Sequence, residues 1–348
     1  MKSVSRAAYG EENGKRHLGD RNRVCLAQEK PQQGFALLTV LLIVALVATL
    51  SGQLIYQQHL TLSRSTNMLH QAQSLAVAWG LEGWVKQGLL LDAKNNQTDH
   101  LQELWAQPML KVPFEGGEIS GQLYDMQARL NLNNVQESDK AQRETWQAII
   151  NRWALLLGLQ QAPAEVLTDW VDADDERLPN GAESDAYLLM QPPYRAANQP
   201  LVMFEELKNI QGLQNIDFEI WQRMKLTASV LPTVTAINVN TAPKEVLMAL
   251  TDWMNESVAE AWIAQRKETP ANSIEEFRTF IAQQTGMESG PLTDALPDWL
   301  ISVNSQYFLL VGQVDFGESL QGLSAIFYRP DRNQVKLVQR WLSVAETH

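Results

Sequence analysis

The feature that most constrains the fold of this chain is an uncharged apolar run near its N-terminus. Residues 35–50 read FALLTVLLIVALVATL, and the apolar character continues less strictly to Tyr56. Because a helix rises 1.5 Å per residue, about 20 residues span the hydrocarbon core of a bilayer. The run exceeds the apolar core of a secretory signal and predicts a membrane helix over residues 35–56.

Charge on the two sides of this run predicts its orientation. Residues 1–34 carry seven Lys/Arg and four Asp/Glu, a net charge of +3, whereas the rest carries 21 basic and 36 acidic residues, a net charge of −15. Basic flanks stay in the cytoplasm, so we expect the N-terminus there and the remaining chain across the membrane. A region with this negative charge repels nucleic acid and favours the binding of cations or basic partner surfaces.

Composition predicts a folded body without disulfides. The 348 residues are 45% hydrophobic and include 11 tryptophans, enough for one large domain or two modest ones. The only cysteine, Cys25, precedes the apolar run. The rest of the chain can therefore form no internal disulfide, and any cross-link between its segments requires a metal or a partner.

Two interpretations of the N-terminus stay open on hydropathy alone. One is an uncleaved signal anchor. The other starts from Gly34 followed by Phe35, which resembles the prepilin peptidase site of type IV pilins and type II secretion pseudopilins. In those families cleavage follows the glycine, and the apolar helix is kept as membrane anchor and assembly spine. Their usual glutamate at mature position five is replaced here by Thr39.

Periodicity divides the rest of the chain. Apolar residues at three- and four-residue steps predict that a stalk helix continues through residues 57–112. Residues 113–136 and 301–348 have strand character and predict a small antiparallel sheet, with a helical domain, residues 137–300, inserted between them. The predicted fold class is α+β. We expect inserted helices at 141–157, 163–171, 204–209, 216–224, 243–254, 257–266 and 274–285, several of them capped, for example at Asp139, Thr241 and Ser273.

A short pattern occurs twice around this helical region. Residues 130–134 read LNLNN and residues 237–241 read INVNT, each an apolar/Asn alternation before a helix. The pattern supports two similar helical units. Its simpler interpretation is that the asparagines only cap turns and helix starts.

The densest acidic segment is a candidate metal site. Residues 169–187 read DWVDADDERLPNGAESDAY, with a Pro-Asn-Gly turn that can fold the segment back on itself. Crowded carboxylates repel, and calcium, which takes six to eight oxygen ligands, relieves that repulsion. The spacing is not that of an EF-hand, and a solvated acidic loop is the alternative. The expected ligands are Asp172, Asp174, Asp175, Glu183 and Asp185.

Residues 237–277 look like a helix-hairpin-helix unit, a fold that often binds DNA through a glycine-containing hairpin. The hairpin here reads TDWMNE over residues 251–256, with two acids and no glycine. A phosphate would meet like charge there, so we expect the fold without the DNA function.

Nothing in the sequence favours an enzyme. It contains no Gly-rich phosphate loop, no His/Cys metal spacing and no nucleophile elbow, so we expect no catalytic residues. The enzyme alternative, a membrane-anchored hydrolase with paired carboxylates, would depend on Asp174 and Glu183.

Together these motifs resemble the minor pseudopilin K family of type II secretion systems. That family has the prepilin-type start without the glutamate, a helical domain inserted in the pseudopilin sheet, a DWxDxD-type loop and an INxNTAPxEVLxAL-type segment. Here the last two are residues 169–174 and 237–250. The 34-residue leader is long for the class.

The resemblance implies a tip subunit. Family members join minor pseudopilins I and J in a complex that caps the pseudopilus for export of folded proteins across the outer membrane. A bulky inserted domain could not be stacked in the shaft, and a tip subunit lacking the glutamate has no subunit beyond it to engage. The resemblance also implies calcium in the helical domain, and contacts with the major pseudopilin.

It further implies processing and methylation by prepilin peptidase, and a single-pass location in the inner membrane with the C-terminal domain periplasmic. The competing hypothesis is a membrane-anchored helix-hairpin-helix protein of the DNA-uptake type, which the charge of −15 opposes.

Overall fold

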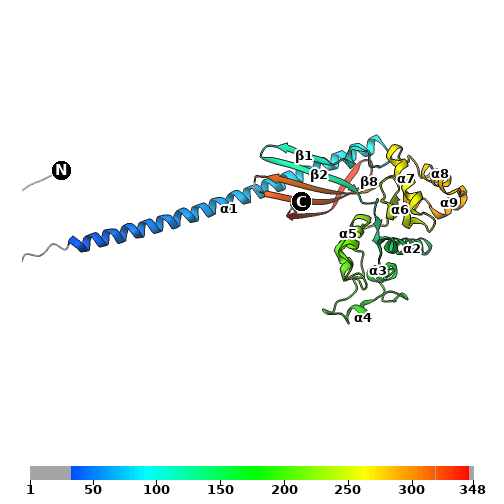
Figure 1. Ribbon diagram of the computed structural model, residues 1–348, viewed down its shortest axis with the longest axis horizontal. Helices are drawn as coiled ribbons and strands as arrows, with labels where there is room; N and C mark the ends of the chain where they lie inside the picture. The colour runs from blue at the N-terminus through cyan, green and yellow to red at the C-terminus, as the bar shows by residue number, and fades with distance from the viewer. Residues whose placement is uncertain (1–32, 318, 345–348) are drawn as a thin grey trace, which may run out of the picture. The chain divides into compact units, whose positions relative to one another are not determined.

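The computed structural model describes residues 33–317 and 319–344 (Figure 1). Residues 1–32 of the predicted leader, which include Cys25, lie outside the described residues. The predicted α+β class is confirmed, with a long N-terminal helix, an antiparallel sheet and a helical domain. The chain divides into two compact units, Met1–Ser63 and Arg64–His348.

The described part of the first unit is the beginning of helix α1 (Gln33–Asn95). Its most apolar 18-residue window has a mean hydropathy of 2.5, and none of that window is buried within the protein. By length and composition, this helix is able to cross a membrane. The hydroxyl of Thr39 donates to the carbonyl of Ala36 at 2.9 Å, so the helix itself satisfies this polar group.

The scaffold of the second unit is a five-stranded antiparallel sheet in the order β1-β2-β7-β8-β9. The strands are β1 (Met109–Phe114), β2 (Gly117–Asp125), β7 (Tyr307–Phe316), β8 (Ser319–Asp331) and β9 (Gln334–Val344). The chain leaves this sheet after β2 and returns to it at β7, so the helical domain is inserted between two neighbouring strands.

The last turns of α1 cover one face of the sheet (Figure 1). Leu81 and Leu89 of α1 pack in one core with Phe308, Leu310 and other side chains of that face. Gly312 allows the close approach, because a Cβ at this position would lie 2.9 Å from Cδ2 of Leu81.

The inserted domain is built from short helices around a large apolar core, which includes Trp146, Trp153 and Phe277. The longer helices are α2 (Lys140–Leu157), α3 (Ala164–Val171), α5 (Phe218–Thr227), α7 (Glu256–Glu268) and α8 (Ile274–Thr285). The shorter ones are α4 (Ser184–Tyr187), α6 (Lys244–Leu250), α9 (Ser289–Ala295) and the 3-10 helices η2 (Leu132–Gln136) and η3 (Phe204–Asn209). A further 3-10 helix, η1 (Leu104–Ala106), lies outside the insertion, before β1.

Two short parallel strand pairs organise the insertion. β3 (Leu130–Asn131) pairs with β4 (Ala228–Ser229), and β5 (Ile237–Asn238) pairs with β6 (Ile301–Ser302). Each pair joins the start of a helical segment to its end. The twice-occurring sequence pattern begins with β3 in one segment and with β5 in the other, so it marks two similarly closed units.

The asparagines of the pattern make equivalent bonds in both units. Asn131 accepts from the backbone N–H of Asn133 at 3.1 Å, and Asn238 accepts from that of Asn240 at 3.0 Å. The simpler interpretation, local turn capping, is therefore confirmed. Both side chains also bond to distant segments, since Nδ2 of Asn131 donates to the carbonyl of Thr233 and Nδ2 of Asn238 donates to Asp125.

Several boundaries differ from those predicted. α1 ends at Asn95 instead of continuing to residue 112, because the following polar residues fold back and β1 forms at residue 109. α6 ends at Leu250, and α9 was not anticipated. Asp139 and Ser273 cap α2 and α8 as predicted, whereas Thr241 caps no helix and instead bonds to Asp125.

Candidate metal centre

The acidic segment forms a folded loop between α3 and α4. Its Pro-Asn-Gly turn is closed by a hydrogen bond from the N–H of Gly181 to the carbonyl of Leu178 at 3.0 Å. The Nε of Arg177 donates to the carbonyl of Gly181 at 2.8 Å. The N–H of Asn180 donates to Glu165 of α3 at 2.6 Å. The loop is therefore held by its own bonds and by α3.

Asp169, in α3, is a structural residue of this loop. Its carboxylate is fully buried and accepts from the N–H of Leu178 at 3.2 and 3.4 Å. Gly181 packs directly on it, since a Cβ at that position would lie 1.9 Å from Oδ2 of Asp169. Only glycine leaves room for this carboxylate to hold the loop.

Three of the five expected ligands come together. Asp172, Asp174 and Glu183 each offer a carboxylate oxygen, and these oxygens lie within 4.8 Å of one another. Glu183 is 3% exposed, and neither of its oxygens has a hydrogen-bond partner among the described residues. Oδ1 of Asp172 is buried and unpartnered in the same way. Unpaired buried carboxylates are costly, so this cluster is a candidate site for a cation.

The protonation behaviour of the cluster agrees with that conclusion. Burial, and then the charges of the neighbouring carboxylates, Asp169 first, raise the pKa of Glu183 to about 7. Burial, and then the charge of Asp174, raises the pKa of Asp172 to about 6. In both acids the charged form is therefore disfavoured, and a bound cation would favour it.

The donor set distinguishes between metals. All candidate ligand atoms are carboxylate oxygens, which suit hard cations such as calcium or magnesium and not zinc, which prefers nitrogen and sulfur. The capacity for further backbone carbonyl ligands in an irregular loop favours calcium over magnesium.

Asp175 and Asp185 do not join the cluster. Both are exposed, and Oδ1 of Asp185 accepts from the N–H of Ala186 at the start of α4. Asp175 is close enough that its charge contributes to the raised pKa of Glu183. Sequence spacing could not separate these acids from the ligands, because the separation depends on how the loop folds.

The helix-hairpin-helix unit is present as α6 and α7. Arg152 of α2 holds the end of α6 by donating to the carbonyls of Ala249 and Leu250 at 2.8 Å each, and it pairs with Asp252 of the hairpin at 2.9 Å, although the side chain of Asp252 is exposed. The absence of DNA binding stays an expectation from the charge of this hairpin.

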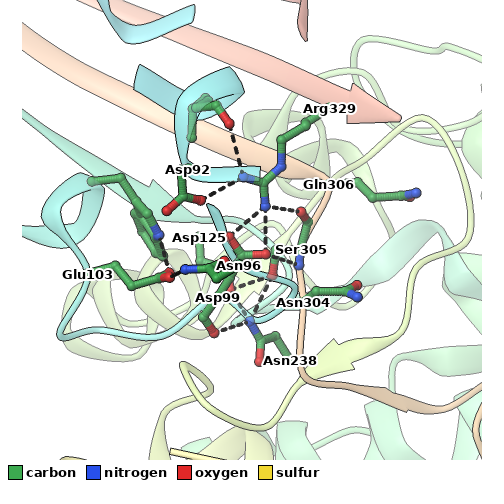
Figure 2. A network of polar contacts seen from close by, with 12 residues as sticks. Asp92, Asn96, Asp99, Glu103, Asp125, Asn238, Asn304, Ser305, Gln306 and Arg329 are labelled. Atoms are coloured by element: carbon green, nitrogen blue, oxygen red, sulfur yellow. Dashed lines mark hydrogen bonds and ion pairs between the residues drawn. The ribbon is translucent and has the colours of Figure 1, made fainter. Parts of the chain in front are cut away.

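A second acidic cluster was not anticipated from the sequence. Asp92, Asp99 and Glu103 also lie within 4.8 Å of one another, but each already accepts from protein donors (Figure 2). Arg329 of β8 donates to both oxygens of Asp99 at 2.5 and 2.6 Å and to Asp92 at 2.9 Å. Arg329 supplies the counter-charge for Asp92 and Asp99, and Glu103 accepts from Asn96 and Trp105, so this cluster is an internal polar network.

Comparison with known proteins gives a consistent result. Two family models, both described as type II secretion system (T2SS), protein K, match residues 128–233 and 237–303. These ranges coincide with the two units closed by β3–β4 and by β5–β6.

Individual relatives carry the same description over nearly their whole length. Type II secretion system protein K of Pseudomonas aeruginosa is 31% identical over 89% of this chain and 92% of its own, and that of Pectobacterium carotovorum is 32% identical over 83% and 90%. Among solved structures, the crystal structure of the GspK-GspI-GspJ complex from enterotoxigenic Escherichia coli contains a chain that matches with a TM-score of 0.69 and 25% identity. The match covers 81% of this chain and all of that one.

Proposed function

Because the chain belongs to the type II secretion system protein K family and is a minor pseudopilin, we propose that it forms the pseudopilus tip complex with minor pseudopilins I and J. The observation that carries this proposal is the match to the full length of one chain of the GspK-GspI-GspJ complex. The tip complex would initiate the pseudopilus that exports folded proteins across the outer membrane.

Two features of this chain support a position at the tip. The insertion between β2 and β7 adds a large helical body to a sheet of five strands, and such a body would obstruct stacking within a shaft. Thr39 carries no charge, and its hydroxyl is used within its own helix. It therefore offers no carboxylate to neutralise the amino terminus of a neighbouring subunit.

Calcium binding is part of the proposed function. Asp172, Asp174 and Glu183 would hold the ion, which would neutralise the buried carboxylates and fix the loop between α3 and α4. Because the chain can form no internal disulfide, an ion at this position would supply a cross-link between segments of the domain that the sequence otherwise lacks.

Assembly is tested by co-expression in the inner membrane with tagged partners I and J of the same secretion system. We expect the full chain to co-purify with both in detergent, and a strain lacking this chain to lose secretion. A chain that co-purifies with neither partner while folding normally would contradict the proposal. The major pseudopilin, which is expected in the shaft, serves as the comparison, and less of it should co-purify with this chain than of partners I and J.

Processing gives a further prediction. If prepilin peptidase acts after Gly34, the mature chain begins at Phe35 with a methylated amino group, and the membrane helix is retained. N-terminal sequencing and mass spectrometry of the membrane fraction measure this directly. Gly34→Leu is expected to leave the leader attached. A mature chain beginning after residue 56 would show instead that the apolar run is a removed signal.

A further inference from the structure

The inserted domain is attached to the sheet at more points than its two covalent connections. The chain enters the domain after Asp125, at the end of β2, and leaves it at Ser305, just before β7. A third segment, Asn238–Thr241, comes from the middle of the insertion and returns to the same position. It lies more than 100 residues from Asp125 in the sequence.

All three segments meet at one buried carboxylate. Oδ2 of Asp125 accepts from Nδ2 of Asn238 at 3.0 Å, from the hydroxyl of Thr241 at 2.5 Å and from that of Ser305 at 2.6 Å. Its Oδ1 accepts from the N–H of Gln127 at 2.8 Å. Burial raises the pKa of Asp125, and every one of these donors is neutral.

Gln127 binds the same segments a second time. Its amide donates to the carbonyl of Ala236 at 3.1 Å and accepts from the N–H of Gln306 at 2.7 Å. Its backbone carbonyl accepts from the N–H of Asn238 at 2.9 Å. The entering, returning and leaving segments are therefore bound to one another in pairs.

Asn238 extends the contacts to the stalk side of the scaffold. Its Nδ2 also donates to the carbonyl of Asp99 at 3.0 Å and approaches the hydroxyl of Ser305 at 2.9 Å (Figure 2). The N–H of Ser305 donates to Asp99 at 2.7 Å, and Asp99 pairs with Arg329 of β8. The side-chain amide of Asn238 therefore contacts Asp125 at the end of β2 and Asp99 in the loop after α1. Asp99 is in turn paired with Arg329 of β8.

We propose that Asn238 and Thr241 form a latch on Asp125 that fixes the orientation of the inserted domain on the pseudopilin scaffold. Two covalent connections at neighbouring strand ends leave a domain free to hinge about the line between them. A third attachment removes that freedom. The latch goes beyond the assembly function proposed above, and it gives the INxNT spacing a role other than helix capping.

A second contact between domain and sheet is apolar and lies in the linker between the two units. Leu231, in the segment between β4 and β5, packs on Tyr307, Leu309 and Ile326 of the sheet. It anchors the linker that follows the first unit, whereas the latch holds the start of the second. Loss of the latch side chains is therefore expected to loosen the second unit without detaching it, because the carbonyl of Gln127 still accepts from the N–H of Asn238 and Nε2 of Gln102 still donates to the carbonyl of Lys267 in α7.

The test measures orientation instead of stability alone. In the full chain with Cys25→Ser, spin labels are placed on exposed Asp315→Cys in β7 and Glu268→Cys in α7, and pulsed dipolar spectroscopy records their distance distribution. We expect a narrow distribution in the otherwise native chain and one about twofold wider in Asn238→Ala/Thr241→Val, since hinge freedom is restored.

Asn240→Ala is the matched control. Asn240 is as buried as Asn238, but its side chain bonds only within the second unit, to the N–H and carbonyl of Ala271 at 2.9 Å. It should lower the melting temperature and leave the distribution narrow. Equal widths in both variants would overturn the latch. If the double variant fails to fold, Thr241→Val alone decides, with broadening again the expected result.

Discussion

Replacement of Arg329 by methionine is expected to lower the free energy of unfolding by about 3–5 kcal/mol, the usual cost of leaving a buried charge without its partner. Arg329 is buried, and its guanidinium donates to Asp99, Asp92 and the carbonyls of Leu89 and Ser305. Methionine fills a similar volume but supplies no donor. Buried Asp99 then keeps only the N–H of Ser305 among its described donors.

Urea unfolding followed by tryptophan fluorescence measures this effect. All 11 tryptophans lie beyond residue 63, so their fluorescence reports on the sheet and the inserted domain. Lys111→Met is the matched control, because Lys111 pairs with Glu118 on the exposed surface and its loss should cost under about 1 kcal/mol. A similar cost for both variants would contradict the assignment of Arg329 as the counter-charge of the buried cluster.

The pH dependence of this variant separates lost charge from lost packing. Burial already raises the pKa of Asp99 to about 7, against the lowering effect of Arg329. Without Arg329 that pKa rises further, so Asp99 is protonated in the folded variant at mildly acidic pH. Because Asp99 of the native chain is itself protonated below about pH 7, the deficit of Arg329→Met should shrink as the pH falls toward about 7 and stay constant below it. The second change Asp99→Asn should recover part of the stability at pH 8.

Local sequence patterns were sufficient for most elements of the fold. The uncharged apolar run, the three- and four-residue periodicity and the caps at Asp139 and Ser273 are all signals within a few residues of one another, and the helices they predict are present. The strand character of residues 301–348 likewise predicted the antiparallel strands β7, β8 and β9. These features depend on backbone preference and on which face is buried, which a short window records.

Contacts between distant segments could not be predicted in this way. Arg329 and Asp99 are separated by 230 residues, and Asp125 and Ser305 by 180, so no local pattern connects them. In the acidic loop, composition identified the segment, but only the path of the chain through Gly181 brings Asp172, Asp174 and Glu183 together and leaves out Asp175 and Asp185. Only the folded backbone decides which of several similar side chains converge.

Removal of calcium is expected to destabilise the inserted domain, and Glu183→Gln is expected to abolish that response. With calcium at about 100 times its dissociation constant, binding contributes about 2.7 kcal/mol, which EDTA should remove. Glutamine keeps the shape of Glu183 and removes its charge. At about pH 8 without calcium, the variant should be more stable than the native chain, because it no longer buries an unpaired carboxylate.

The sign of the pH effect gives an independent measurement. The pKa of Glu183 is about 7 in the folded chain and about 4.5 when unfolded, so between these values the folded chain binds more protons. The stability of the calcium-free native chain should therefore fall as pH rises through this window, and calcium should reduce the fall. Glu183→Gln should show a smaller fall under both conditions.

Asp185→Asn is the control that tests the ligand set itself. The sequence predicted Asp185 as a ligand, but the structure leaves it exposed, with one oxygen bonded to the N–H of Ala186. Its variant should therefore keep the full calcium-dependent rise in melting temperature, while Asp172→Asn and Glu183→Gln lose it. Loss of the response in Asp185→Asn would mean that calcium draws α4 toward the loop. A native chain whose melting temperature is unchanged by EDTA would exclude a structural ion at this site.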